Sequence, residues 1–410
     1  MRDVEKIRQD FPMLQNKVMQ NHPLVYLDNA STTFKPKCVI DAVTKYYIED
    51  TSNAHRGDYE LSATVSNAYE SSRETVAKLI NAKPREVVFT SGASASLNLV
   101  AYGYGRKHLK KGDVILLTEA EHASNILPWF KVAEETGAII EYITLDETGK
   151  LTIDNYKKAL HKNVKIVAIA SVTNVLGYLA PIKEMTKLAH EIGAIMVVDG
   201  AQGVPHIKTD VKDDDVDFLA FSAHKMCGPT GVGALYGKYE LLEITEPFML
   251  GGGSNARFDT CGNILLKDAP YKFEAGTPAI EAVLGFKAAC EYLMNIGFDR
   301  IAEMEKELHK YLIGKLKELD NIVLYNEEAN TGIITFNVKN VFSQDASSYL
   351  GTKGIAIRAG NHCAKILVNV LQTSDTLRAS LYFYNIKEEC DALVEALKTT
   401  TVENCIDIFI

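Results

Sequence analysis

The fold class of this chain is decided by residues 194–225, AIMVVDGAQGVPHIKTDVKDDDVDFLAFSAHK. Two short apolar runs lie in this stretch, at 194–198 and 218–221, and each ends on polar residues, DG at 199–200 and SAHK at 222–225. Runs that are apolar on both faces are typical of strands in a parallel sheet covered on both sides. The stretch therefore predicts two buried strands with polar residues, suited to binding or catalysis, at their carboxyl ends.

Four similar runs precede this stretch and are separated by helix-patterned segments: EVVFT (86–90), DVILLT (113–118), AIIEYI (138–143) and KIVAIASV (165–172). Together they predict an α/β core with a mainly parallel sheet. Polar patches follow the runs, at SGAS (91–94), EHASN (121–125), TNVLG (173–177), DGAQG (199–203) and SAHK (222–225). Ligands bind outside the carboxyl ends of strands in open α/β sheets, so we expect these patches to converge on one crevice.

A second unit is predicted after KFEAGTP (272–278). A helical stretch there places Ile301, Met304, Leu308, Leu312 and Leu319 near one face. Strand-like runs follow, namely NIVLY, GIITFNV, GIAIR and LRASLYFY, and KEECDALVEALK (387–398) is typical of a closing helix. The run LGGGSNARFDTCGNIL (250–265) is interpreted as a long mobile loop.

Length favours more than one domain, because 410 residues exceed the roughly 250–300 at which a single core stops growing. We predict a large α/β domain at 21–284 and a small α+β domain at 285–410, with the N-terminal segment 1–20 packing on the small domain. The small α+β domain would carry the loop that contains Cys363.

Composition indicates an ordinary globular protein, with 47% hydrophobic and 24% charged residues. A net charge of -9 argues against nucleic acid or an anionic membrane as the main partner. The first residues, MRDVEKIRQDFPML, lack the apolar run of a signal peptide, and no stretch has about 20 uninterrupted apolar residues, so a cytoplasmic protein is expected.

Lys225 follows a predicted strand and precedes a Gly/Pro turn, GPTGVG (228–233), which no helix pattern follows. It is either a surface lysine or an amine that forms a Schiff base with an aldehyde cofactor. Pyridoxal 5'-phosphate would also need a carboxylate for its ring nitrogen, and Asp199 at the end of the preceding strand is the candidate. A helix cap and a magnesium ligand are the alternatives for Asp199, although no P-loop motif is present.

The segment TSGASASLNLVA (90–101) places small and hydroxyl residues at the start of a predicted helix, where an anion such as a phosphate is favoured. The same letters also fit a plain helix N-cap. His122 could lie over a cofactor ring or pass protons. Asn174 and Gln202 could bind the polar edge of that cofactor ring. His224 could contact a phosphate or serve packing alone.

Cys363, in RAGNHCAK (358–365), is open to four interpretations: metal ligand, disulfide partner, buried filler or nucleophile. The seven cysteines are odd in number, scattered and without a C-x-x-C pair. This pattern argues against a disulfide framework and a structural zinc site, and we predict no metal. A substrate whose sulfur needs an acceptor would favour the nucleophile.

Six motifs in order, SAHKMCGPTGVG, VVDGAQG, NVLG, AEHASNILPW, FEAGTP and IRAGNHCA…LRASLY, resemble those of the group II, SUF-type cysteine desulfurases. These belong to the class V aminotransferase family of fold-type I pyridoxal-phosphate enzymes. The resemblance covers nearly the whole chain. It implies an α/β transferase with a mainly parallel sheet of the seven-stranded type in the large domain, plus a smaller α+β C-terminal domain.

The resemblance also implies roles residue by residue. Lys225 matches the cofactor-binding lysine, Asp199 the partner of the ring nitrogen, and His122 the ring-stacking histidine that handles protons. Gln202 and Asn174 match contacts to the cofactor's phenolic oxygen or the substrate. The implied phosphate site comprises Ser222, His224, Gly92, Ala93, Ser94 and, from the second subunit, Thr277.

Arg378 matches the arginine that grips the substrate carboxylate, with Arg358 in support and His55 in a substrate-side loop. Cys363 matches the cysteine that accepts sulfur from L-cysteine as a persulfide, favoured as a thiolate by Arg358 or a charged His362. A sulfur-acceptor protein of iron–sulfur cluster assembly and a homodimer are implied as partners. Departures from the family pattern stand at Asn361, Ser171, Gly253 and Ala93.

Three alternatives remain from the sequence. Selenocysteine lyase shares these residues and would act on L-selenocysteine, and another class V aminotransferase would need no nucleophilic cysteine. From a different class, an inactive scaffold could bind a sulfur carrier.

Overall fold

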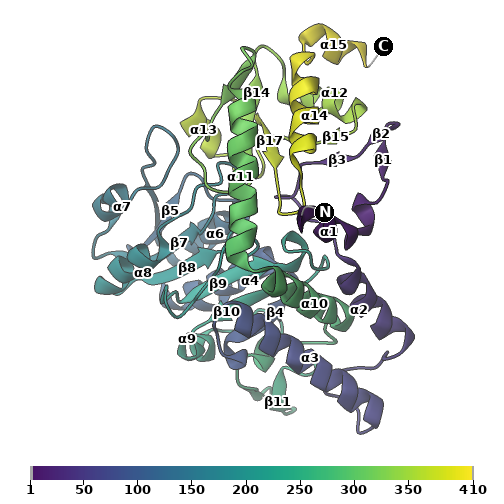
Figure 1. Cartoon of the computed structure of the whole chain (residues 1–410). Helices are drawn as coiled ribbons and strands as arrows, with labels where there is room; N and C mark the ends of the chain where they lie inside the picture. The colour runs from purple at the N-terminus through teal and green to yellow at the C-terminus, as the bar shows by residue number, and fades with distance from the viewer. Residues whose placement is uncertain (1–2, 409–410) are drawn as a thin grey trace.

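A seven-stranded sheet forms the centre of the larger part of the molecule, as the computed structural model of residues 3–408 shows (Figure 1). Its strand order is β4-β10-β9-β8-β7-β5-β6. Strands β9, β8, β7, β5 and β6 run parallel, whereas β10 is antiparallel to both β9 and β4. The strands are β4 (Val87–Thr90), β5 (Val114–Thr118), β6 (Ile139–Ile143), β7 (Val164–Ala170), β8 (Ile195–Asp199), β9 (Phe218–Ser222) and β10 (Gly233–Gly237). Each of the six predicted runs forms a strand, which confirms the mainly parallel sheet.

Strand β10 is the one member of this sheet that the sequence interpretation missed. It begins at Gly233, the last residue of the glycine-rich stretch 228–233, and its five residues include a glycine at each end. Glycine is depleted in strands, so the pattern carries a weak signal. The structure needs Gly233, because a Cβ there would lie 2.4 Å from the Phe221 carbonyl oxygen and 2.6 Å from Gly92 Cα.

Helices cover both faces of the sheet. Alternate residues of β7 point to opposite faces: Val167 joins one buried cluster, and Ile166 and Ala168 join the other. The first face packs α3 (Glu60–Leu79), α7 (Ile153–Ala159), α8 (Ile182–Glu191) and α10 (Ile280–Ile296), with α2 (Lys37–Ile48) beyond. The second packs α4 (Ala93–Leu99), α6 (Leu127–Thr136) and α9 (Tyr239–Ile244). No helix within residues 3–408 is both long and apolar enough to span a membrane.

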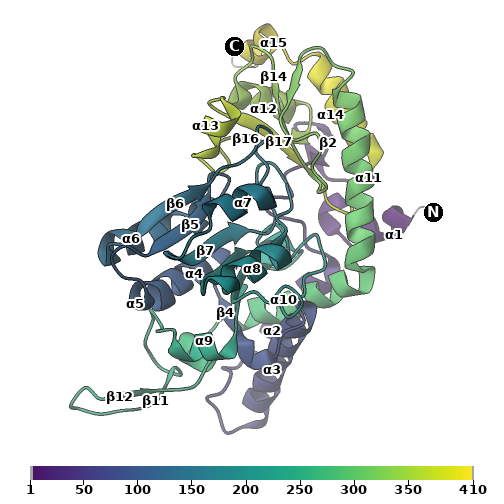
Figure 2. The same cartoon turned by 90° about the vertical axis from the view of Figure 1, so that its left-hand side faces the viewer.

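A second, antiparallel sheet of order β13-β14-β17-β16 lies near the C-terminus (Figure 2). Its strands are β13 (Ile322–Leu324), β14 (Ile333–Val338), β16 (Arg358–Gly360) and β17 (Thr376–Ser380). The helices beside it are α11 (Phe298–Leu316), α12 (Ser343–Thr352), α13 (Leu367–Leu371), α14 (Lys387–Lys398) and α15 (Val402–Asp407). The predicted closing helix is confirmed as α14. The predicted strand at 377–384 is too long, because the strand ends at Ser380 and the chain then turns. In this turn Tyr382 N donates a hydrogen bond to the Asn385 side chain at 2.7 Å.

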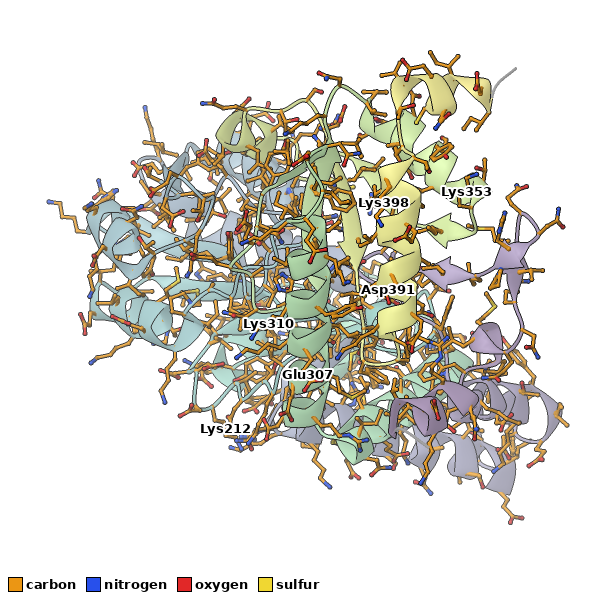
Figure 3. All side chains as sticks on the ribbon, turned by 45° about the horizontal axis from the view of Figure 1, so that its top comes forward. Lys212, Glu307, Lys310, Lys353, Asp391 and Lys398 are labelled. Carbon is orange, nitrogen blue, oxygen red and sulfur yellow. The ribbon has the colours of Figure 1, made fainter. Side chains whose placement is uncertain are left out.

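Helix α11 carries the apolar face expected from its sequence. Ile301, Leu308 and Leu312 are buried, and Met304 is partly buried. Figure 3 shows the charged side chains of Glu307 and Lys310 on the outer surface of the same helix. Leu319 lies beyond the end of α11 and packs against the cluster of the second sheet.

The N-terminal segment reaches both parts of the molecule. Strand β3 (Val25–Tyr26) pairs in parallel with β15 (Ile355–Ala356). After α1 (Asp3–Gln9), the buried ring of Phe11 contacts Tyr292 on α10 and also Phe383 and Tyr384. The predicted domain boundary at 284/285 falls inside α10, and the division into domains stays a prediction. The predicted N-terminal segment and small domain include residues 1–2 and 409–410, which lie outside the described residues.

The segment 250–265, expected to be a loop, contains most of a hairpin. Strand β11 (Asn255–Phe258) pairs with β12 (Ile264–Leu266), and the pair projects from the body of the molecule (Figure 2). The side chain of Asp259 organises the turn by accepting hydrogen bonds from Cys261 N at 2.9 Å and Asn263 N at 3.0 Å. Such Asx bonding stabilises a tight turn locally.

We expect Phe11→Ala to lower the free energy of unfolding by about 3–5 kcal/mol, because the ring is fully buried among three aromatic side chains. Urea denaturation followed by circular dichroism measures the loss. Met13→Ala is the matched control, since Met13 is 40% exposed and should change stability little. Equal effects of the two substitutions would contradict the packing role of Phe11.

Candidate active site

The five polar patches converge as expected at the carboxyl ends of the parallel strands. They line a cavity of about 210 Å³ together with residues of the second sheet and of the N-terminal segment. The predicted site residues in its lining are Ala93, Ser94, His122, Asn174, Asp199, Gln202, Ser222, His224, Lys225, Arg358 and Arg378. A larger hollow of about 1010 Å³ lies between α8 and residues 207–216, and its lining contains none of them.

Lys225 ends the short 3-10 turn that follows β9, so its amine enters the cavity from a rigid support. The residue keeps some exposure because it faces the cavity, but protein surrounds the amine. Burial lowers the pKa of Lys225 to about 8, against the opposing charge of Asp199. About a tenth of the amine is therefore neutral, and hence nucleophilic, at pH 7, far more than for a lysine with an ordinary pKa.

Asp199 closes β8 and is 5% exposed. Burial raises the pKa of its carboxyl, while a 2.9 Å hydrogen bond from Ala201 N and the charge of Lys225 lower it. A buried carboxylate of this kind is stabilised by a cationic group placed against it. A protonated ring nitrogen would meet that need.

A turn between β4 and α4 forms the candidate phosphate cradle. Gly92 has a φ of 144°, a backbone conformation open to glycine. Ala93 N donates to Ser222 Oγ at 2.8 Å, and the hydroxyls of Ser94 and Ser124 lie 2.6 Å apart. Burial and then Lys225 lower the pKa of His224 to about 4, so a phosphate would meet a neutral imidazole.

His122 is also neutral near pH 7, because burial, followed by the charges of Lys225, Arg358 and Arg378, lowers its pKa to about 4. Its Nδ1 atom accepts a hydrogen bond from Ser124 N at 3.1 Å. The proton of the neutral ring is therefore on Nε2.

Two amide oxygens in this lining are buried without a hydrogen-bond partner within the described residues: Asn174 Oδ1 and Gln202 Oε1. Their NH₂ groups are used, since Asn174 donates to His362 O and Gln202 to Ala30 O, each at 2.7 Å. Unpartnered buried acceptors are costly and rare, so they indicate a ligand with donor groups. With the lysine amine, the carboxylate and the anion cradle, these residues fit pyridoxal phosphate.

The two arginines face each other across β16 and β17, where Arg358 and Arg378 are register partners. Arg378 is buried, and its NH1 atom donates to Asn174 O at 2.8 Å. Burial lowers the pKa of Arg378 to about 10, so the guanidinium stays charged at neutral pH. Its Nε atom has no partner in the described chain.

Cys363 lies in a loop fastened to the cavity wall. Its carbonyl oxygen accepts from Ala123 N at 2.8 Å, next to His122, and its Sγ atom lies 3.7 Å from Arg358 NH2. Cys363 is exposed and adopts a φ of 60°, following His362 at 50°. The expected charge on His362 is wrong: it is 2% exposed and burial lowers its pKa to about 3. Arg358 is thus the cation at the sulfur.

The structure does not bring His55 and Thr277 into the cavity of a single chain. His55 Nε2 lies 3.1 Å from Glu70 Oε1, and Thr277 lines a separate cavity of about 360 Å³. Thr277 was expected to act from a second subunit, and the substrate-side role of His55 stays a prediction.

Sequence reasoning missed two groups at the site. Segment 28–33, DNASTT, inserts Ser31 into the lining, and its signal was a polar run directly after the apolar VYL. Buried Glu121 binds Thr118 Oγ1, Asn125 Nδ2 and Ala170 N at 2.7–2.9 Å, so it ties the end of β7 to the turn that carries His122.

The fold and this residue set define a pyridoxal-phosphate-dependent enzyme of fold-type I. The model of the family "Aminotransferase class-V" matches residues 25–393, and the chain belongs to that family. This membership confirms the predicted fold class and the predicted cofactor.

Relatives within the family are cysteine desulfurases by name. The chain is 44% identical over 401 residues to a probable cysteine desulfurase of Halalkalibacterium halodurans, covering 97% of this chain and 98% of that protein. It is 42% identical to the cysteine desulfurase of Haloferax volcanii, with 96% of each chain covered. The apo structure of the cysteine desulfurase of Thermococcus onnurineus superposes with a TM-score of 0.92 at 38% identity, covering 97% of this chain and 98% of that one. The predicted resemblance is thereby confirmed.

We expect the rate at which the apoprotein takes up pyridoxal phosphate to rise with pH and level off above about 8, because the Lys225 amine loses its proton there. Stopped-flow absorbance measures the rate, and Lys225→Ala is the control without an amine. Asp199→Asn should move the midpoint to lower pH, since the Asp199 charge raises the lysine pKa. A rate that keeps rising to pH 10 would contradict the lowered pKa.

Proposed function

We propose that this chain is a pyridoxal-phosphate-dependent cysteine desulfurase, which converts L-cysteine to L-alanine and forms a persulfide on Cys363. The observation that carries the proposal is the thiol of Cys363, held 3.7 Å from a guanidinium that lines the Lys225 cavity. A cysteine beside a cation is placed to react as a thiolate. An aminotransferase that uses a 2-oxo acid acceptor needs no such residue.

When bound, the cofactor supplies an electron sink for the pair left on the substrate's Cα. Arg378, with Arg358 in support, holds the substrate carboxylate through charge-assisted hydrogen bonds. Lys225 Nζ, as a free amine, would take the Cα proton, and His122 would pass protons through Nε2.

The electrons of the sulfur-transfer step balance without an external oxidant or reductant. The Cys363 thiolate attacks the substrate sulfur, an S–S bond forms and the Cβ–S bond breaks. The electron pair of that bond goes to the carbon, which ends as the methyl group of alanine after protonation, so the carbon is reduced and the Cys363 sulfur is oxidised. An acceptor thiol must afterwards remove the outer sulfur. Exposure of Cys363 supports transfer to a sulfur-acceptor protein of a SUF-type iron–sulfur assembly system in the cytoplasm.

A homodimer is part of the proposal, because it would supply His55 and Thr277 to the neighbouring site. Thr277 lines its cavity together with Phe248 and Met249, whose side chains are each 52% exposed. Exposed apolar side chains at such a rim are typical of a subunit interface.

Cys363→Ala should lower sulfide release from L-cysteine in the presence of a reductant by more than about 100-fold, because the attacking sulfur is removed. Bound cofactor, read from its absorbance, should be unchanged. Lys225→Ala should abolish both sulfide and alanine. The control is Cys261→Ala, which removes another exposed cysteine and should retain full activity.

Sulfide release unchanged by Cys363→Ala would contradict the persulfide route. Activity on L-selenocysteine with none on L-cysteine would instead favour a selenocysteine lyase. A requirement for a 2-oxo acid would favour an aminotransferase, and a purified protein that stays colourless with added cofactor would favour a scaffold.

We expect the double variant Phe248→Asp, Met249→Asp to be a monomer that retains pyridoxal phosphate poorly, because two carboxylates cannot be buried against a second copy. Light scattering after size exclusion measures the mass. Phe130→Asp on α6 is the control, since its side chain is exposed and lies outside the lining of the Thr277 cavity. A wild-type protein that is itself monomeric at micromolar concentration would contradict the dimer.

A further inference from the structure

The hydroxyl of Ser31 lies between the two arginines of the site. Arg378 NH2 donates to Ser31 Oγ at 3.0 Å, and Arg358 NH1 donates to the same oxygen at 3.2 Å. Ser31 in turn donates to Asp28 Oδ1 at 2.7 Å. A serine hydroxyl has one proton and two acceptor sites, so all its hydrogen-bonding capacity is used. The position of this one oxygen therefore fixes the spacing of both guanidiniums.

Asp28 is the carboxylate that meets this pair. Its Oδ1 atom also lies 3.2 Å from Arg378 NH2, and the side chains of Arg378 and Asp28 are 1% and 24% exposed. The two guanidiniums and the Asp28 carboxylate together carry a charge of +1, apart from Lys225 and the sulfur of Cys363, which lies 3.7 Å from Arg358 NH2. The ring of His122 adds none, because its pKa lies near 4.

One donor remains unused in this arrangement. Arg378 Nε is buried and has no hydrogen-bond partner in residues 3–408, whereas NH1 is bonded to Asn174 O and NH2 to Ser31 and Asp28. A buried guanidinium N–H without an acceptor indicates that a ligand acceptor completes the site. The remaining charge of +1 matches a single carboxylate.

We propose that Asp28 and Ser31 form a specificity element, the Asp28–Ser31 pair, which adjusts the two arginines to accept amino acids with one carboxylate and to disfavour those with two. This inference rests on the proposed role of the arginines in holding the substrate carboxylate. Ser31 acts as a positioning residue, since it orients both guanidiniums. Asp28 supplies the negative charge that repels a second carboxylate.

The test compares two amino acids that differ by one carboxylate, L-alanine and L-aspartate, as ligands of the holoenzyme. The dissociation constant of each is read from the absorbance of the bound cofactor, without turnover. Asp28→Asn raises the local charge from +1 to +2, so we expect the affinity for L-aspartate relative to L-alanine to increase at least about tenfold, equivalent to about 1.4 kcal/mol. Ser31→Asp lowers the charge to zero and should shift the ratio in the opposite direction.

Ser31→Ala keeps the charge and removes the bridge. It should raise both the dissociation constant of L-alanine and the KM for L-cysteine about tenfold, with kcat changed less than about twofold, because the carboxylate grip is loosened while the sulfur chemistry is untouched. Ser71→Ala on α3 is the matched control, since its hydroxyl accepts only from Lys287 among the described contacts and lies outside the cavity lining.

A general loss of structure would weaken both ligands alike and leave their ratio unchanged. The proposal is overturned by an unchanged ratio in Asp28→Asn and Ser31→Asp, or by unchanged L-alanine binding in Ser31→Ala. Absence of sulfide release from L-cysteine in the wild-type enzyme would count against the proposed function. The ratio of dissociation constants needs no turnover, so it decides separately whether the pair selects by charge.

Discussion

The buried amine of Lys225 opposite the carboxylate of Asp199 is the constraint on which the rest of the site depends. Both groups stand at the carboxyl ends of adjacent parallel strands, β8 and β9, so the sheet fixes their separation. Burial pushes the pKa of the lysine down and that of the aspartate up, and each charge opposes the shift of the other. The pair thus keeps a reactive amine and a carboxylate ready for a cationic ring inside the protein.

The second sheet matters because it completes this site from the other side. Strands β16 and β17 bring Arg358 and Arg378 over the cavity, and the loop after β16 carries Cys363. Two hydrogen bonds from the large sheet's loops, Ala123 N to Cys363 O and Asn174 Nδ2 to His362 O, hold that loop in place. Two consecutive residues with positive φ are costly outside glycine, and these bonds help to maintain them. The departure at Asn361 also serves this loop, since its side chain donates to Ser374 O at 2.6 Å.

The N-terminal segment links the two halves through short polar contacts. The carbonyl oxygen of His224, directly before Lys225, accepts from Thr33 N at 3.0 Å and from Thr32 Oγ1 at 3.0 Å. A few residues earlier, Ala30 O accepts from Gln202 and Ser31 bridges the arginines. One stretch of chain therefore contacts the turn before Lys225, the amide of Gln202 and the two arginines, and these contacts couple their positions.

The sequence by itself determined the parallel strands, the polar residues at their ends, the closing helix and most residues of the cavity, because apolar periodicity and strand-end chemistry are local properties of the chain. Strand β10, the hairpin at 255–266 and the end of β17 were not predicted, since glycine content, a turn-forming aspartate and a tertiary bend override the local pattern. Only the tertiary structure decided that His362 is buried and neutral, that His55 and Thr277 lie outside the cavity, and that Ser31 bridges two arginines more than 300 positions away in the chain. Burial and long-range hydrogen bonding depend on which distant segments meet, and no local pattern in the chain encodes that.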